Sequence, residues 1–163
     1  MPDGDFYGAL RALREADVDF LVVGGLAAVL NGAPVNTFDL DIVHSREPAN
    51  VTRLLQVLES LDAAFRMQPE RRLRPNASHL SSSGHLNLIT RCGPLDVLGT
   101  IGRSLDYRDL LPHTIELEIG GGLRVRVLDL ETLISLKETL AGEKDLAVLP
   151  ILRRTLQEKR KAH

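Results

Sequence analysis

The chain has 163 residues, of which 44% are hydrophobic and 26% are charged, and this balance is typical of one soluble globular domain. The net charge of −2 excludes a global basic field for nucleic acid, so any such binding has to be local. The single cysteine, Cys92, excludes an internal disulfide and a cysteine-based zinc site. Residues 1–7 lack a secretory signal and no apolar run reaches bilayer length, so we expect a cytoplasmic protein without a membrane partner.

Hydrophobic periodicity in the first half of the chain predicts an alternation of helices and strands, an α/β or α+β beginning. The expected elements are a helix over 6–16, a strand over 18–23, a short helix over 26–30 capped by Gly32, a strand over 37–43 and an amphipathic helix from Pro48.

The second half predicts more strands and a helical end. The expected elements are a strand over 85–90, a strand from Leu95, a hairpin over 115–127 around three glycines, a helix over 130–140 with Asp129 as N-cap, and a last helix. Residues 67–84 break the pattern and predict a loop. Its arginines at 71, 72 and 74 are suited to a triphosphate or an RNA backbone, although solvated loop charge is the better explanation.

Two carboxylates, Asp39 and Asp41, close the second expected strand. Alternation along a strand points both to one face and turns Phe38, Leu40 and Ile42 into apolar packing on the other. Paired carboxylates repel unless a cation lies between them, and hard oxygen ligands suit Mg²⁺ or Mn²⁺. Two surface aspartates that simply end a strand are the alternative.

The pair Gly24-Gly25 follows the first apolar strand directly and precedes an apolar helix. Glycines there let a phosphate approach the backbone, where N–H groups at the helix start can bind it. Taken alone, the pair favours a plain tight turn. Neither G-x-G-x-x-G nor G-x-x-x-x-G-K-[ST] occurs, which argues against the Rossmann and P-loop interpretations.

A Gly-Gly turn, a short helix and a strand with Asp-x-Asp together resemble the DNA polymerase β-like nucleotidyltransferase superfamily. Residues 23–27 and 37–43 are most similar to the AbiEii-type proteins, which include nucleotidyltransferase toxins of toxin–antitoxin and abortive-infection systems. The resemblance implies a minimal nucleotidyltransferase fold of the α+β (mixed α/β) class, with a mixed sheet flanked by helices. We expect a single domain over 1–163 with a helical C-terminal part from about 129.

Asp96 lies between Leu95 and Val97, where a carboxylate is costly to bury without a charged partner. It matches the third acidic position of the superfamily; a cap on the turn after Pro94 is the alternative. The resemblance implies that Asp39, Asp41 and Asp96 are catalytic and hold two Mg²⁺ (or Mn²⁺) ions. It also implies that Gly24 and Gly25 hold the phosphates of a nucleoside triphosphate such as ATP.

Lys137 lies beside an apolar stripe of its helix and can extend its ammonium to a phosphate or to solvent. In AbiEii-type proteins a helix ending Leu-Lys precedes a Lys-Asp turn, which Leu136-Lys137 and Lys144-Asp145 match. Val148 replaces a further aspartate of that motif. This departure does not touch the three metal-binding aspartates.

The resemblance therefore implies a metal-dependent nucleotidyltransferase (EC 2.7.7-type). It would transfer a nucleoside monophosphate to a hydroxyl of tRNA or another RNA, of a protein or of a small molecule, as the toxin of a pair with a cognate antitoxin as partner. Two alternatives stay open. One is a catalytically degenerate nucleotide-binding or antitoxin-bound protein of the same fold, and the other is an aminoglycoside-type adenylyltransferase.

Overall fold

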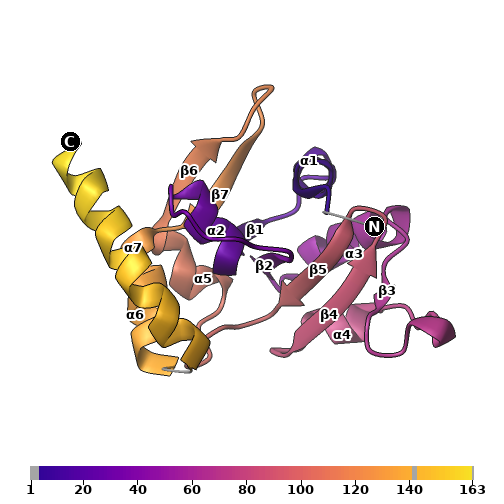
Figure 1. Cartoon of the computed structure of the whole chain (residues 1–163). Coiled ribbons are helices and arrows are strands. Elements are labelled where there is room, and N and C mark those ends of the chain that lie inside the picture. Colours follow the sequence, from indigo (N-terminus) through magenta and orange to yellow (C-terminus); the bar gives the residue numbers. More distant parts are fainter. Residues whose placement is uncertain (1–3, 141–142, 163) are drawn as a thin grey trace.

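A seven-stranded mixed sheet forms the centre of the molecule, with strand order β3-β4-β5-β2-β1-β7-β6 (Figure 1). The computed structural model describes residues 4–140 and 143–162, without the side chains of residues 140 and 143–145. The strands are β1 Phe20–Val23, β2 Leu40–His44, β3 Ala64–Phe65, β4 His85–Thr90, β5 Gly93–Leu98, β6 Thr114–Glu118 and β7 Arg124–Leu128. The α-helices are α1 Phe6–Glu15, α2 Gly24–Leu30, α3 Pro48–Ser60, α4 Ala77–Ser81, α5 Tyr107–Leu110, α6 Leu130–Leu140 and α7 Glu143–Lys161.

Strand β2 is central because it pairs antiparallel with β1 and parallel with β5. This register places Asp41 opposite Val23 on one side and opposite Asp96 on the other. The expected mixed sheet flanked by helices is confirmed. The expected helical end is also present, since α6 and α7 pack against each other beside the sheet.

The sheet is covered unequally on its two faces. All four side chains of β1 are buried, whereas β4 alternates between buried Leu86 and Leu88 and exposed His85 and Asn87. The apolar face of β4 and β5 packs into the core with α3 and α4 behind it (Figure 1). Asp96 pairs with Asn87 across the strands and therefore lies on the open face.

The N-terminal boundary of β2 differs from the sequence prediction. The strand begins at Leu40 rather than at Thr37, so Asp39 lies just before it. Phe38, expected in apolar packing, is 70% exposed. The reason is the end of the neighbouring strand: β1 stops at Val23, where the chain turns into α2, so the residues before Leu40 lack a ladder on that side.

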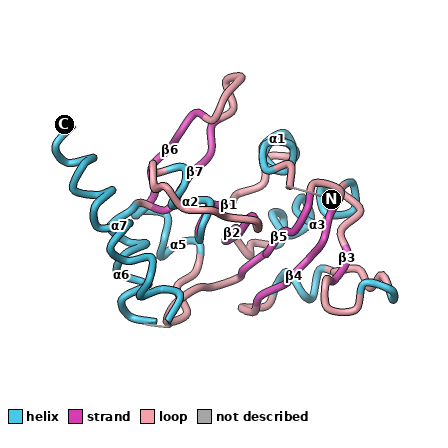
Figure 2. The backbone as a smooth tube through the Cα atoms, viewed as in Figure 1, coloured by secondary structure: helices cyan, strands magenta, loops and turns pink. Residues whose placement is uncertain are grey.

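The predicted loop over 67–84 is wrong in part, because it contains a 3₁₀ turn, Pro69–Arg71, and helix α4. Figure 2 shows both as helical stretches between longer loops. Asn76 starts α4 by accepting a hydrogen bond from the His79 N–H at 2.9 Å, and the His79 ring accepts one from the Asn76 N–H at 3.0 Å. This reciprocal cap, with histidine in place of the usual glutamate, escaped the sequence prediction.

Most other local predictions are confirmed. Asp129 caps α6 by accepting a 2.8 Å hydrogen bond from the Thr132 N–H. The β6–β7 hairpin brings Glu116 within 3.2 Å of Arg124 and 4.0 Å of Arg126, the expected cross-strand ion pairs. No helix in the described parts of the chain combines the length and the apolar character that crossing a membrane requires.

Candidate active site

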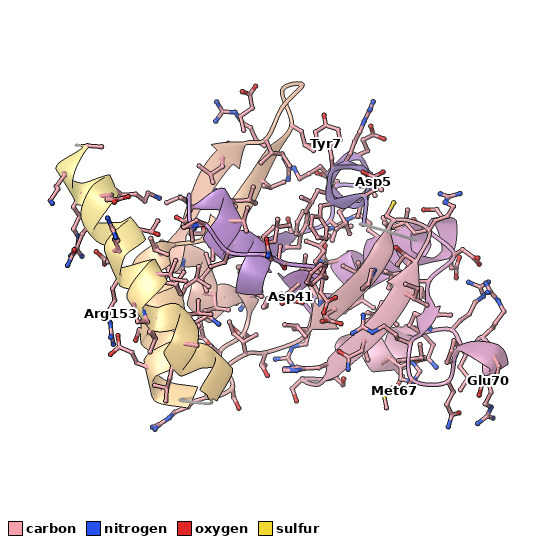
Figure 3. All side chains as sticks on the ribbon, viewed as in Figure 1. Asp5, Tyr7, Asp41, Met67, Glu70 and Arg153 are labelled. Carbon is pink, nitrogen blue, oxygen red and sulfur yellow. The ribbon has the colours of Figure 1, made fainter. Side chains whose placement is uncertain are left out.

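Two carboxylates meet in the middle of the sheet. Asp41 of β2 and Asp96 of β5 are register partners on adjacent parallel strands, so their side chains leave the same face next to each other. Figure 3 shows Asp41 at the centre of the molecule, at the edge of α2 and beside β5. The sequence predicted both residues, and the structure brings them together.

Asp41 has an environment that opposes ionisation. Its Oδ1 atom is buried and has no hydrogen-bond partner among the described residues. Burial, a hydrogen bond with Asp96 and the charges of Asp96 and Asp39 together raise the pKa of Asp41 to about 8, against the opposing charge of Arg66. Two carboxyls can share a hydrogen bond only when one of them is protonated. Without a cation the pair therefore retains a proton in its folded state near neutral pH.

These two residues fit a divalent cation. A metal between them would supply the missing partner of Asp41 Oδ1 and remove the repulsion that raises its pKa, and Mg²⁺ and Mn²⁺ favour such hard oxygen ligands. Among the side chains that the structure describes, no three histidine, cysteine or acidic residues converge into a preformed metal site. Asp39 acts on Asp41 through its charge from the loop before β2.

The close approach of the Asp41 carboxylate requires a glycine at position 24. The φ of Gly24, +68°, favours glycine, and a Cβ atom there would lie 2.2 Å from Asp41 Oδ2. Gly25 is also closely packed, because its Cβ would lie 2.8 Å from Thr37 Oγ1. Both glycines stand in the first turn of α2, which begins two residues earlier than predicted. They let the start of the helix approach Asp41.

A cavity of about 160 Å³ opens beside Asp41. Gly24, Asp41 and Lys137, three of the predicted site residues, line it together. Its remaining wall is mainly apolar and includes Leu98, Leu133 and Leu136. Helix α6 thus carries Lys137 to the same cavity as the carboxylate, as the interpretation of Lys137 requires. The predicted Lys144-Asp145 match lies outside the described side chains.

Arg66 is a site residue that the sequence analysis missed. It follows β3 directly, and its Nη2 donates a 2.9 Å hydrogen bond to Asp96 Oδ1. Its charge also lowers the pKa of Asp41, against the stronger effects that raise it. Asp96 is thirty residues away in sequence, and only the β3–β4–β5 pairing joins the two, so a local pattern could not have indicated the contact.

The three arginines of the predicted loop have surface partners. Arg72 and Arg74 both pair with Asp62, and Arg71 donates a 3.0 Å hydrogen bond to the Gln68 side chain. The side chains of Arg72, Arg74 and Asp62 are between 46% and 59% exposed. Solvated surface charge, the explanation that the sequence favoured, is therefore what the structure supports.

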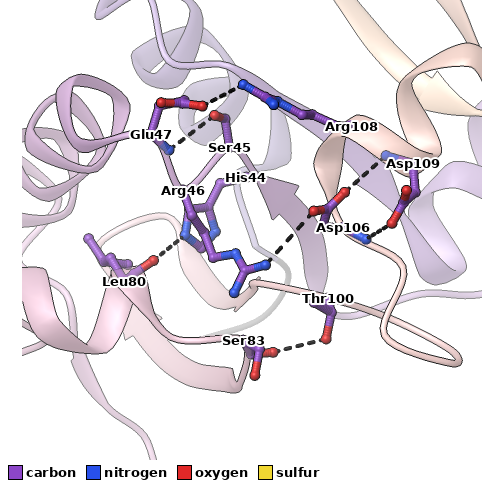
Figure 4. Close-up of polar contacts among 10 residues, drawn as sticks. All are labelled: His44, Ser45, Arg46, Glu47, Leu80, Ser83, Thr100, Asp106, Arg108 and Asp109. Carbon is purple, nitrogen blue, oxygen red and sulfur yellow. Dashed lines mark hydrogen bonds and ion pairs between the residues drawn. The ribbon is translucent and has the colours of Figure 1, made fainter.

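A second polar cluster lies beyond the carboxyl end of β2, around a pocket of about 270 Å³. Its ion pairs are Arg108 with Glu47 at 2.7 Å and Arg46 with Asp106 at 3.9 Å (Figure 4). Buried His44 contacts the Leu80 carbonyl oxygen at 2.7 Å through Nε2, and burial lowers its pKa. The arginines of this pocket are thus already matched by acids.

The fold resembles two solved structures over nearly the whole chain. One is a candidate nucleotidyltransferase from Thermotoga maritima, with 19% identity, a TM-score of 0.55 and coverage of 93% of this chain and 90% of that one. The other is the lincosamide antibiotic adenylyltransferase LnuA bound to lincomycin, with 15% identity, a TM-score of 0.61 and coverage of 91% and 94%. The fold is that of the nucleotidyltransferases. No protein-family model and no curated protein matches the sequence.

Proposed function

We propose that the chain is a nucleotidyltransferase that moves a nucleoside monophosphate from a nucleoside triphosphate to a hydroxyl of an acceptor. The observation that carries the proposal is the Asp41–Asp96 pair, in which a buried carboxylate oxygen lacks a partner beside a cavity. If the pair had only a structural role, we would expect the fold to supply a hydrogen-bond partner for this buried oxygen, because burying it without one costs free energy. The nucleotidyltransferase fold of the chain supports the same chemistry.

The site residues have distinct roles in this proposal. Asp41 and Asp96, with Asp39 beside them, would hold Mg²⁺ or Mn²⁺. Bound there, the metal would neutralise the charge that develops on the phosphate oxygens. Gly24 and Gly25 leave room for the triphosphate at the first turn of α2, and Lys137 would neutralise part of its charge.

The reaction forms a bond between the acceptor oxygen and the α-phosphorus. It breaks the bond between the α-phosphorus and the oxygen that bridges to the β-phosphate, so pyrophosphate leaves. Asp96 would accept the proton that the acceptor hydroxyl loses, because it lies at the pair and on the open face of the sheet.

The acceptor and the biological setting are finer parts of the proposal. The AbiEii-like sequence of residues 23–27 and 37–43 favours a cytoplasmic toxin that acts on RNA such as tRNA or on a protein, with an antitoxin as partner. A small-molecule acceptor is the second candidate. The specific observation that favours it is the similarity in fold to an adenylyltransferase bound to its antibiotic.

The test is transfer of label from each α-³²P-labelled nucleoside triphosphate into cellular RNA, protein and small-molecule pools, including lincosamides and aminoglycosides, in the presence of Mg²⁺. Asp41→Asn is the test variant, and Asp62→Asn, at an exposed aspartate outside the site, is the matched control. Label in one pool that Asp41→Asn abolishes and Asp62→Asn retains would support the transferase and identify its acceptor class.

Two results would overturn this proposal. Equal labelling by wild type and Asp41→Asn would remove the carboxylate pair from the reaction. Nucleotide binding without label in any pool would favour the catalytically degenerate binding protein instead. Loss of label with both variants would indicate a folding defect, so circular dichroism accompanies each assay.

A further inference from the structure

Arg66 is held firmly against the carboxylate pair. Its Nη2 donates to Asp96 Oδ1 at 2.9 Å, its Nη1 donates to the Leu88 carbonyl oxygen at 3.0 Å, and its backbone N–H donates to the Asn87 carbonyl oxygen at 2.9 Å. Its side chain is 34% exposed and that of Asp96 is 16% exposed. A fixed positive charge therefore already lies where the proposed metal site needs one.

The ion pair of Arg66 differs from the other arginine pairs nearby. Arg74 makes a similar set of contacts, with the Asp62 carboxylate and the Ala63 carbonyl oxygen, but that group lies at the surface. Asp96 is instead the register partner of Asp41, whose buried oxygen lacks a hydrogen bond among the described residues. The Arg66–Asp96 and Arg74–Asp62 pairs make the same kinds of contact, but only the first lies beside Asp41. Arg74 is therefore a matched control for Arg66.

We propose that Arg66 is a built-in counter-cation of this site, which competes with the divalent metal for Asp96 until a nucleoside triphosphate draws the guanidinium away. The inference rests on the proposed function, because it assumes that Asp41 and Asp96 bind a metal. A guanidinium that donates to Asp96 Oδ1 occupies one face of that oxygen and repels a second cation. Phosphate oxygens offer it a bidentate partner that a single carboxylate oxygen does not.

The consequence is coupling between metal and nucleotide. While Arg66 is hydrogen-bonded to Asp96, the affinity of the site for the metal alone is low. The affinity for the metal is higher when the triphosphate is bound. Because coupling is reciprocal, each ligand raises the affinity for the other by the same factor. Arg66 thereby disfavours occupation of the site by a metal ion that has arrived without its substrate.

The test measures Mn²⁺ affinity by electron paramagnetic resonance, with and without a nucleoside triphosphate whose α,β-bridging oxygen is replaced by a methylene group. The variants are Arg66→Gln, Arg66→Lys and the control Arg74→Gln. In Arg66→Gln we expect Mn²⁺ alone to bind about 5-fold or more tightly than in wild type, and the enhancement by nucleotide to shrink by a similar factor. Arg66→Lys retains the charge, so its Mn²⁺ affinity without nucleotide should stay near wild type, but its enhancement by nucleotide should shrink because an ammonium cannot pair bidentately with phosphate. Arg74→Gln should stay near wild type in both.

A melting experiment gives a second readout that does not depend on catalysis. In the metal-free protein, Arg66→Gln should lower Tm more than Arg74→Gln, because it leaves Asp96 without its partner beside Asp41. Mn²⁺ should restore most of the difference in Arg66→Gln and none of it in Arg74→Gln. A purely structural role for Arg66 predicts a deficit that Mn²⁺ does not repair.

The outcomes separate this inference from the proposed function. Mn²⁺ binding that is unchanged or weaker in folded Arg66→Gln overturns the role of Arg66 and leaves the metal site intact. Absence of Mn²⁺ binding by the wild type, even with nucleotide, overturns both proposals. Tighter binding by Arg66→Gln with a reduced nucleotide effect supports both.

Discussion

Asn50 and Asp41, two polar side chains near opposite ends of strand β2, differ in how the fold satisfies their buried atoms. Beyond the carboxyl end of β2, Asn50 is 1% exposed and makes three hydrogen bonds: its Oδ1 accepts from the Asp19 N–H at 2.7 Å, and its Nδ2 donates to the Asp19 and Ser45 carbonyl oxygens at 3.0 and 2.8 Å. Near the amino end of the strand, Asp41 has a buried oxygen without a hydrogen-bond partner in the described chain and a neighbouring carboxylate. The fold therefore satisfies the buried atoms of Asn50 and leaves Asp41 Oδ1 without a partner among the described residues. His44, the last residue of β2, also has a buried Nδ1 without a described partner, but burial lowers its pKa and favours the neutral imidazole, which carries no charge.

This difference distinguishes stability from function. A buried polar group with all its hydrogen bonds made inside the fold is explained by its structural role. Asn50 of helix α3 has such a role, because it binds Asp19, just before β1, and Ser45, just after β2. An unsatisfied buried carboxylate costs free energy, and a binding site is the usual reason for which a protein carries such a cost. The contrast therefore predicts that substitutions at the Asp41 end change activity, whereas substitutions at the Asn50 end change stability.

The largest effect should come from Asp41→Asn. The variant keeps the shape of the side chain but loses a metal-binding charge, and we expect the rate of nucleotidyl transfer to fall by at least about 10³-fold. Metal stabilisation of several kcal/mol corresponds to a loss of this size. Steady-state kinetics with labelled triphosphate measures the change, and a rate within tenfold of wild type would show that the reaction does not need the charge of Asp41.

Gly24→Ala should have the next largest effect. The new Cβ would lie 2.2 Å from Asp41 Oδ2 and would move the carboxylate, and a displacement of that kind costs about 10²-fold in rate. Gly122→Ala is the matched control, since its φ is +78° but its Cβ meets no atom within 4 Å in the part of the chain that the structure describes. Both variants should lose about 1 kcal/mol of stability to backbone strain. Equal activity in the two would show that the Gly24 contact with Asp41 is unimportant.

The sequence could predict the parts of this site that depend on local pattern. Asp96 alternates with Leu95 and Val97 along its strand, and Asp41 alternates with Leu40 and Ile42, so strand parity placed each carboxylate on one face. The register that joins them, Asp41 opposite Asp96, is a tertiary property that the resemblance supplied and the parity did not.

Other features lay outside the reach of local pattern. The alternating pattern predicted that β2 includes Phe38 and buries its side chain, but Phe38 lies before the strand and is exposed. The boundary of β2 depends on where its neighbour β1 ends, which the pattern does not contain. The pairing of Arg66 with Asp96 depends on the packing of three strands. The N-terminal cap of α4 uses His79 where the usual capping pattern has glutamate or glutamine, so the pattern did not reveal it.

Asn50→Ala should affect stability and leave chemistry unchanged. Removal of three hydrogen bonds at a buried position should lower the free energy of unfolding by roughly 2–3 kcal/mol. The activity of the molecules that remain folded should equal that of wild type. Urea denaturation and a rate normalised to the folded fraction measure the two quantities, with Asn36→Ala at an exposed position as control. A lower rate per folded molecule would mean that this end of β2 also serves the site.

The last prediction concerns the pH dependence of stability in the metal-free protein. Folding raises the pKa of Asp41 from 3.8 to about 8, so between these values the folded state keeps a proton that the unfolded state has released. Stability from this residue is therefore full below about pH 4 and is lost as the pH rises to about 8. His44 acts oppositely, because burial lowers its pKa below 6.5 and its contribution is lost as the pH falls beneath that value.

Urea midpoints of wild type and Asp41→Asn across this range, with chelator present, isolate the contribution of Asp41. The advantage of Asp41→Asn over wild type should grow as the pH rises and should stop growing above about pH 8. Added Mg²⁺ should reduce that advantage. A difference that is independent of pH would mean that Asp41 ionises normally in the folded protein.

The most direct test of the account is a crystal structure with Mn²⁺ and a non-hydrolysable nucleoside triphosphate, in which anomalous scattering locates the metal. We predict an anomalous peak in contact with carboxylate oxygens of both Asp41 and Asp96, with the triphosphate at the first turn of α2 and Arg66 released from Asp96. A peak elsewhere, with Asp41 still hydrogen-bonded to Asp96, would contradict the assignment of the carboxylate pair as the metal-binding centre of a nucleotidyltransferase.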